Sequence, residues 1–287
     1  MKFGSLNRWG LAVNVVCCAV LARADLPTSA SPGISFGQEQ RQDPPMRLFW
    51  AQVDLTAPGV SVRVSPGGDD PDGPGPYQTV LMTPSDIARR DGFDLAVNGD
   101  FFSVKKPVEG KPIEQQPGAA GPSRWGAALG PAMTDGKSWS VSKAKRPCLV
   151  IDTDRKARIL EVDRPADGMW EVVSGNVILV KEGKIIAHQN KDRHPRTVAG
   201  VNEKGTKLTL LVVDGRQAGV SIGMTYEDLS KEMIRLGCFD AINLDGGGSS
   251  AMVAKEIASG KIITCNKPSE GKERPVANVV GVRVQSK

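Results

Sequence analysis

The chain has 287 residues, 40% hydrophobic and 24% charged, so it has the composition of a soluble globular protein large enough to bury a sizeable core. Its formal net charge of +5 is spread along the sequence without a block of lysine and arginine. This argues against nucleic-acid binding and is compatible with an anionic substrate. The 32 glycines, 20 prolines and few aromatic residues predict many turns and short strands.

Residues 1–24 have the pattern of a signal peptide. Lys2 and Arg8 accompany a mostly apolar stretch at 11–21, and Ala22-Arg23-Ala24 fits a small-x-small cleavage site. The apolar stretch is too short for a stable membrane span. We therefore expect a protein exported to the periplasm or the cell exterior; a buried N-terminal helix is the alternative.

Cleavage after Ala24 leaves three cysteines: Cys148, Cys238 and Cys265. An odd number permits at most one internal disulfide, and the sequence does not say which two would pair. The chain has no Cys-x-x-Cys pair and no Cys/His cluster, so we expect no zinc site. The oligomeric state stays open.

Residues 25–45 are rich in Ser, Pro, Gly and Gln and are expected to form a flexible lead-in to a single domain at 46–287. Thr83-Pro84-Ser85-Asp86 combines a capping box with proline at the first helical position and predicts a short helix ending near Arg90. Apolar patterns in the first half of the chain predict strands at 47–53, 60–64 and 95–97.

Residues 105–124 contain proline and glycine throughout and predict a long loop, which we expect to border the site. The segment 225–236 has a capping box and apolar residues three to four apart, which predict the second helix, ended by Gly237. Further strands are predicted at 148–152, 158–162, 177–180, 184–187, 239–242 and 276–284, with a hairpin formed by 196–201 and 207–213. Many strands and two helices indicate an α+β fold, a single domain dominated by a mixed or antiparallel β-sheet core.

Three acids, Asp100, Asp214 and Asp245, each follow an apolar strand and adjoin glycine. If these strands share one sheet edge, the carboxylates converge in one pocket. The alternative for each is an ordinary turn, since Asp-Gly and Asn-Gly are good turn formers.

Asp245 is followed by Gly246-Gly247-Gly248-Ser249-Ser250. Three consecutive glycines suit a loop whose backbone approaches a ligand closely or turns its N–H groups toward an anion. A flexible surface turn is the alternative.

Arginines supply the complementary charge, because a guanidinium binds phosphate oxygens in a bidentate fork. Arg196, Arg216 and Arg274 adjoin the same motifs; the alternative for each one singly is a solvated surface charge, which is the commoner role of arginine.

Five segments occur in a fixed order: Asn98-Gly99-Asp100-Phe101-Phe102, His194-Pro195-Arg196-Thr197, Val213-Asp214-Gly215-Arg216, Asn243 through Ser250, and Arg274-Pro275-Val276-Ala277-Asn278. Together they resemble the phosphodiester glycosidase family, from about Ala96 to the C-terminus. The animal member of this family, the uncovering enzyme, removes N-acetylglucosamine from masked mannose 6-phosphate, and many bacterial members are exported.

The resemblance implies an α+β catalytic domain that hydrolyses a sugar-1-phosphodiester to free sugar and a phosphomonoester, here from an envelope or extracellular glycan. A phosphate monoester is a stabilised leaving group, so one carboxylate can suffice as nucleophile or base. We expect Asp245 in that role, with Asp214 second. The expected substrate-binding residues are Asn98, Gly99, Asp100, Arg196, Thr197, Arg216, Gly246, Gly247, Gly248, Ser249, Ser250, Arg274 and Asn278.

The scheme requires no metal or other cofactor, although Asp100, Asp214 and Asp245 could together hold Ca²⁺ or Mg²⁺. Two other functions are compatible with the sequence. One is a metal-dependent phosphodiesterase that cuts the P–O bond. The other is a non-catalytic module that binds anionic glycans or takes part in exopolysaccharide assembly.

Overall fold

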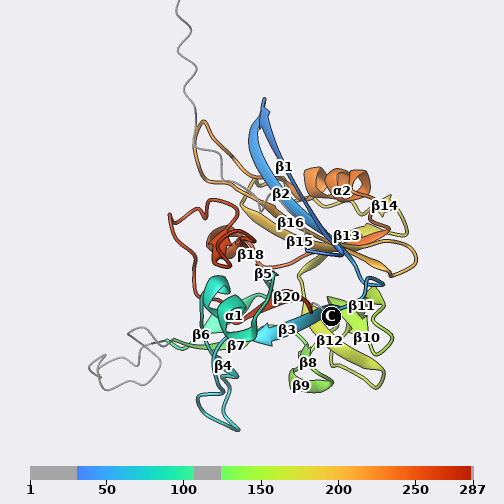
Figure 1. Cartoon of the computed structure of the whole chain (residues 1–287), viewed down its shortest axis with the longest axis vertical. Helices are drawn as coiled ribbons and strands as arrows, with labels where there is room; N and C mark the ends of the chain where they lie inside the picture. Colours follow the sequence, from blue (N-terminus) through green and yellow to red (C-terminus); the bar gives the residue numbers. More distant parts are fainter. Residues whose placement is uncertain (1–30, 107–123, 286–287) are drawn as a thin grey trace, which may run out of the picture.

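The computed structural model describes residues 31–106 and 124–285 (Figure 1). The predicted signal peptide at 1–24 lies outside this range, and so does most of the loop predicted at 105–124. Among the helices in the described ranges, none has both the length and the apolar character needed to cross a membrane.

The largest sheet has seven strands, all paired antiparallel. In spatial order they are β1 (Ile34–Gln42), β2 (Pro45–Asp54), β16 (Lys207–Val213), β15 (Arg196–Val201), β17 (Asp240–Asn243), β13 (Val177–Lys181) and β14 (Lys184–Ile185). The predicted hairpin is present as β15 and β16.

Two five-stranded antiparallel sheets complete the core. One contains β19 (Ile262–Thr264), β18 (Met252–Lys255), β5 (Leu95–Asn98), β20 (Asn278–Val284) and β3 (Val60–Pro66). The other contains β11 (Ala157–Val162), β10 (Arg146–Asp152), β12 (Met169–Ser174), β8 (Ala132–Thr134) and β9 (Lys137–Ser140). A separate small sheet contains β4 (Thr79–Val80), β7 (Trp125–Ala128) and β6 (Phe102–Val104).

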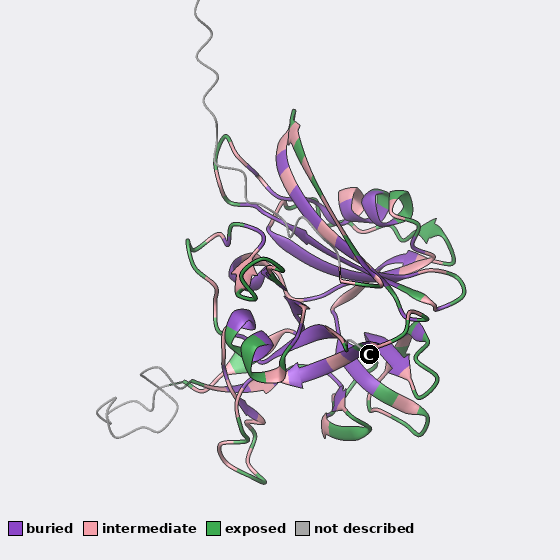
Figure 2. Cartoon of the chain, viewed as in Figure 1, coloured by how far each residue is buried: buried purple, intermediate pink, exposed green. Residues whose placement is uncertain are grey.

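The main hydrophobic core lies where the three large sheets face one another, and buried residues concentrate there (Figure 2). Phe49 and Leu210 come from the seven-stranded sheet, Leu95 and Val280 from the sheet that contains β5, and Leu149 from the sheet that contains β10. Strands with both faces covered have nearly continuous apolar sequences. The six residues of β15 are all buried for this reason.

Each helix covers the outer face of one sheet (Figure 1). Helix α2 (Tyr226–Arg235) packs on the seven-stranded sheet through Leu229 and Met233, and α1 (Pro84–Asp91) packs beside β5 through Ile87. Both begin at the predicted N-caps, Thr83 and Thr225, whose side chains accept a backbone N–H three residues on. The α+β fold dominated by antiparallel sheets is therefore confirmed.

The predicted flexible lead-in at 25–45 is wrong for 34–42, which form edge strand β1. This segment is mostly polar, so its hydrophobic pattern gives little signal. Its order comes from continuous backbone pairing with β2 and from ion pairs to α2. Arg41 lies 2.8 Å from Glu232, and Arg235 lies 3.0 Å from Glu39.

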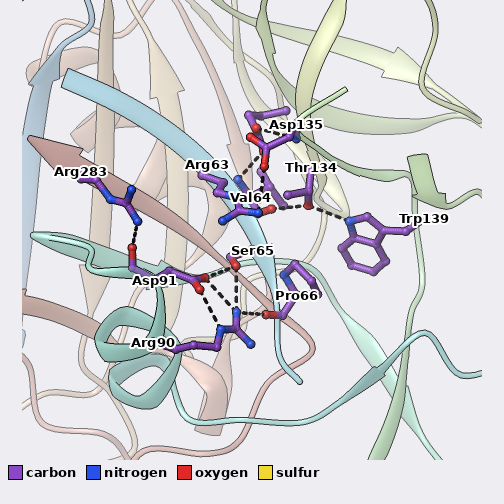
Figure 3. A network of polar contacts seen from close by, with 11 residues as sticks. Arg63, Val64, Ser65, Pro66, Arg90, Asp91, Thr134, Asp135, Trp139 and Arg283 are labelled. Atoms are coloured by element: carbon purple, nitrogen blue, oxygen red, sulfur yellow. Dashed lines mark hydrogen bonds and ion pairs between the residues drawn. The ribbon is translucent and has the colours of Figure 1, made fainter. Parts of the chain in front are cut away.

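A polar network fixes β3, the outer strand of its sheet, to the neighbouring elements (Figure 3). The Arg90 guanidinium donates to the Ser65 hydroxyl at 3.0 Å and to the Pro66 carbonyl at 2.8 Å. On the open edge, the N–H of Val64 donates to a carboxylate oxygen of Glu171 at 2.7 Å, and the Thr134 hydroxyl donates to the Val64 carbonyl at 2.5 Å.

Cys148, Cys238 and Cys265 are all buried and free, and burial raises the pKa of each thiol to about 11 or 12. A thiol protonated at neutral pH is a poor nucleophile and a poor metal ligand. These three residues therefore belong to the packed interior.

Candidate functional site

The loop after β17 carries Asp245, and it meets the end of β5 although the two strands lie in different sheets. The N–H of Asp245 donates to the carbonyl of Gly99 at 3.0 Å, and the Asn98 side chain donates to the carbonyl of Asp245 at 2.7 Å. The backbone of Asp245 is thus held from both sides by two residues of one strand end.

Asn98 and Thr197 were predicted to bind substrate, but both are fully buried and hold the loop instead. The Asn98 Oδ1 accepts a hydrogen bond from the Thr197 hydroxyl at 2.6 Å and from the N–H of Ala251 at 3.1 Å. With its oxygen satisfied twice, Asn98 joins β5, β15 and the far end of the glycine loop. The structure therefore favours strand-end hydrogen bonding for Asn98 over contact with substrate.

The three glycines are explained by close backbone packing more than by anion binding. A Cβ on Gly246 would lie 2.8 Å from the Pro195 carbonyl oxygen, Gly247 has a left-handed φ of 61°, and a Cβ on Gly248 would overlap the Arg274 side chain. The N–H of Gly246 donates to Asp245 Oδ1 and that of Gly247 to the Pro195 carbonyl. Among the described residues, only the Gly248 N–H of the three has no intramolecular partner, so the predicted anion cradle is reduced to this one amide.

Ser249 and Ser250 turn back onto the loop itself. Their N–H groups donate to the carbonyls of Gly246 and Gly247, and both side chains are buried. Within the described chain neither hydroxyl has a hydrogen-bond partner at bonding distance. The Ser249 hydroxyl nevertheless lies close enough to Asp245 to lower the pKa of that carboxyl.

Asp245 lines a cleft of about 740 Å³. Burial raises the pKa of its carboxyl to about 6, against the lowering effects of the Ser249 hydroxyl, the Gly246 N–H and the charge of Arg274. A carboxyl with this pKa is largely ionised at neutral pH and remains basic enough to accept a proton from water. The other residues lining the cleft are Leu81, Phe101, Phe102, Val104, Arg124, Glu270, Lys272, Glu273, Arg274 and Pro275.

Arg274 is the predicted arginine that the structure places in the cleft with Asp245. Its guanidinium pairs with the Glu270 carboxylate four residues earlier, which lowers the pKa of Glu270. The side chains of Arg274 and Glu270 are 39% and 45% exposed, so an incoming anion can compete for this guanidinium.

Arg216 lies beside the glycine loop, close enough to Glu270 for its charge to help lower the pKa of that carboxyl. It is exposed, has a left-handed φ of 59°, and its guanidinium would lie 3.2 Å from a Cβ on Gly247. The Nη2 of Arg216 is 3.5 Å from Nδ1 of His194, and burial together with the charges of Arg196 and Arg216 lowers the pKa of that histidine. Arg216 does not line the cleft that contains Asp245.

Arg196 was predicted to bind an anion but is buried with its guanidinium already engaged. It stacks over the Tyr226 ring at 4.3 Å and donates to the carbonyls of Met224, at 3.2 Å, and Asp192, at 3.1 Å. Burial lowers its pKa. The structure therefore gives Arg196 the task of fixing α2 to β15.

Asp214 was predicted as the second catalytic carboxylate, and its position argues against that role. Only 1% exposed, it forms an ion pair with Arg47 at 2.8 Å and accepts the N–H of Lys267 at 3.1 Å. Burial raises its pKa despite these partners. Asn266 joins Asp214, at 3.0 Å, to the carbonyl of Ser250, at 3.1 Å, so Asp214 supports the loop from behind.

The condition under which the three acids would converge, that they follow strands of one sheet, is not met. Asp214 and Asp245 follow β16 and β17 of the seven-stranded sheet, whereas Asp100 follows β5 of another sheet. Residues 31–106 and 124–285 contain no group of three or more Asp, Glu, His or Cys side chains arranged to hold a metal ion.

Asp100, Gly99 and Asn278 pack beneath the loop and do not line the cleft. Asn278 Oδ1 accepts the N–H of Asp100 at 2.8 Å, and a Cβ on Gly99 would lie 2.1 Å from that oxygen, so only glycine fits there. Sequence reasoning missed Glu270, Lys272 and Arg124 in the cleft. The four-residue spacing of Glu270 and Arg274 could have predicted their ion pair. It could not have predicted that the pair lies in the cleft.

Comparison with known proteins gives one family. A family model for phosphodiester glycosidases matches residues 91–283. A curated relative, the SPbeta prophage-derived uncharacterized protein YomE of Bacillus subtilis, is 38% identical over 90 residues, which is 31% of this chain and 13% of the relative. The chain thus spans only a small part of that relative's length.

Two solved structures share the fold. The catalytic domain of zebrafish N-acetylglucosamine-1-phosphodiester alpha-N-acetylglucosaminidase, auto-inhibited by its pro-peptide, is 21% identical with a TM-score of 0.65, covering 90% of this chain and 86% of that one. A Burkholderia pseudomallei protein named as exported is 15% identical with a TM-score of 0.61, covering 83% and 74%. With two thirds of its length matched by one family model, the chain belongs to the phosphodiester glycosidase family.

Proposed function

We propose that this protein hydrolyses the glycosidic bond of a sugar-1-phosphodiester and releases free sugar and a phosphomonoester. The observation that carries the proposal is the position of Asp245, in a cleft, beside a guanidinium and held rigidly by β5. Membership of the phosphodiester glycosidase family supports this class of reaction.

The cleft has the groups that such a reaction needs. Asp245, ionised at neutral pH, acts as nucleophile at the anomeric carbon or as base for the attacking water. The departing phosphate carries its own negative charge and needs little proton donation. Cationic side chains in the cleft, Arg274, Lys272 and Arg124, stabilise that charge.

To bind the phosphodiester, the Arg274 guanidinium must give up part of its ion pair with Glu270. Both side chains are partly exposed, so solvent screens the ion pair and little free energy is lost when the phosphate replaces the carboxylate. Glu270 then remains close to the phosphate, so a dianionic phosphomonoester binds less well than a phosphodiester monoanion and the product is released. The second negative charge, which forms as the glycosidic bond breaks, is stabilised by Arg274, Lys272 and Arg124 against the repulsion of Glu270.

We further propose that the protein acts outside the cytoplasm on an envelope or extracellular glycan. The support is the export pattern of residues 1–24 and the similarity in fold to a protein named as exported. The phosphate and hydroxyl groups of such glycans match the polar and cationic lining of the cleft.

The test is hydrolysis of a panel of sugar-1-phosphodiesters and UDP-sugars by the purified protein in ¹⁸O-labelled water. The proposal expects the label on the anomeric carbon of the free sugar, turnover that chelator does not abolish, and a loss of kcat of about 10³-fold in Asp245→Asn. Glu161→Gln, at an exposed carboxylate of β11, is the matched control and should keep full activity.

Other outcomes identify the alternatives. Label on phosphorus together with loss of activity in chelator would establish a metal-dependent phosphodiesterase. Binding of an anionic glycan without turnover, unchanged in Asp245→Asn, would establish a non-catalytic module.

A further inference from the structure

A second carboxyl group, Asp100, lies directly beneath Asp245. Gly99, whose carbonyl accepts the Asp245 N–H, is the residue immediately before Asp100. Asp100 is 1% exposed, its N–H donates to Asn278 at 2.8 Å, and its Oδ2 accepts the N–H of Gly130 at 3.0 Å. Its backbone N–H and one carboxyl oxygen are therefore held by hydrogen bonds.

The other carboxyl oxygen of Asp100, Oδ1, indicates its protonation state. Asp100 Oδ1 has no hydrogen-bond partner at bonding distance among the described residues, and neither has the nearby hydroxyl of Ser174. A buried carboxylate oxygen whose nearby donor is one neutral hydroxyl, that of Ser174, is less well stabilised than a carboxylate oxygen in water. A proton on Oδ1 turns this oxygen into a donor, for which the Ser174 hydroxyl is the adjacent acceptor.

Three titratable or charged groups face Asp100 from the elements around it. Arg146 and Cys148 lie on β10, and Asp245 follows β17. Burial is the largest influence and raises the pKa of Asp100 to about 7. The Ser174 hydroxyl, the Gly130 N–H and the Arg146 charge lower the pKa, and the charge of Asp245 raises it. Cys148 stays neutral, because burial raises its thiol pKa to about 12.

We propose that Asp100 is a positioning residue that keeps its proton while Asp245 is ionised, so that the two carboxyl groups work as a singly protonated pair. This inference rests on the proposed function and assigns to Asp100 no contact with substrate. Loss of the Asp100 proton places a second negative charge beneath the loop. That charge opposes binding of an anionic phosphodiester and makes Asp245 harder to ionise.

The pair predicts a bell-shaped pH profile for kcat/KM. The value of kcat/KM rises as Asp245 ionises near pH 6 and falls to a lower level as Asp100 loses its proton near pH 7. Asp100→Asn mimics the protonated acid, because its amide can donate toward Ser174 and its oxygen can accept from Gly130. The variant should keep the acidic limb and lose the basic limb.

The experiment measures kcat/KM from pH 5 to 9 for the wild-type protein, Asp100→Asn and the control Glu161→Gln, which should keep both limbs. A basic limb that persists unchanged in a folded Asp100→Asn protein overturns the inference. A purely structural role would lower kcat/KM by the same factor at all pH values and leave both limbs in place, and it too contradicts the proposal.

A second measurement needs no substrate. In a ¹³C-NMR titration of the wild-type carboxyl carbons, the inference expects two aspartates with midpoints near 6 and 7, the lower one absent in Asp245→Asn. Asp214, whose pKa burial also raises, is assigned separately as the resonance that is absent in Asp214→Asn. Titration of every aspartate below pH 5 overturns it. If no sugar-1-phosphodiester is hydrolysed at any pH, the proposed function fails, and this titration still decides whether Asp100 holds its proton.

Discussion

Glu273 connects the cleft to the N-terminus of α1, and its removal should weaken both. One carboxylate oxygen accepts the Ser85 N–H at 2.8 Å, and the Thr264 hydroxyl donates to the other at 2.6 Å. The first turn of α1 is otherwise complete, because Pro84 has no N–H and the N–H of Asp86 donates to Thr83. Glu273 therefore satisfies the one remaining donor of that turn.

The magnitude follows from these contacts. A hydrogen bond to a charged group contributes about 1.5–3 kcal/mol, and an anion at a helix N-terminus adds about 0.3–1 kcal/mol. The contacts share one partly exposed side chain and are not additive. We therefore expect Glu273→Ala to lower the free energy of unfolding by about 3 kcal/mol, and Glu273→Gln, which keeps one acceptor, by about 1 kcal/mol.

Urea denaturation measures this effect, and steady-state kinetics measure its consequence for the cleft. Because Arg274 follows Glu273 directly, loosening this segment should raise KM for a phosphodiester more than it lowers kcat. Glu161→Ala is the control and should change the unfolding free energy by less than about 0.5 kcal/mol. If Glu273→Ala unfolds at the wild-type urea midpoint, the proposed link between α1 and the cleft does not exist.

Three further predictions concern the loop. Activity should fall as pH decreases through about 6, because burial raises the pKa of Asp245 and protonation removes the reacting carboxylate. Asp245→Asn should retain only a residual rate that does not depend on pH in this range. Asp214→Ala should cost about 3–5 kcal/mol of stability, because it leaves Arg47 half-buried without its ion-pair partner, and an Asp214→Ala protein as stable as wild type in urea would contradict this assignment. Gly248→Ala should displace Arg274 and raise KM at least tenfold with little change in melting temperature; unchanged KM would show that the close approach is unimportant.

The parts of the fold that depend on local sequence could be predicted. The hairpin of β15 and β16 has apolar runs on both sides of a polar turn, and α2 has a capping box and a regular apolar face, so each signal is local in the sequence. The Asp245 loop was recognisable because three consecutive glycines are rare where no close approach requires them.

The rest depends on contacts that no local pattern encodes. Asp214 looks like Asp245 in sequence, and only the pairing of β16 with β2 brings Arg47 to its carboxylate. Likewise, the orientation of Arg196 depends on Tyr226, thirty residues away on α2. Strand β1 escaped prediction because its order comes from a partner strand and two ion pairs to α2, not from its own composition.

The outward N–H of Val64 on β3 donates to the carboxylate of Glu171, and the outward carbonyl of Val64 accepts from the hydroxyl of Thr134. An outermost strand with vacant backbone groups is a template on which a second molecule can polymerise. Here the Glu171 and Thr134 side chains bond to these backbone groups and prevent such pairing. The arrangement requires the carboxyl group of Glu171 to be buried. A chain that has lost Glu171 should consequently be recovered as soluble aggregates at concentrations where the intact protein stays dispersed, even while its catalytic cleft is still correctly formed.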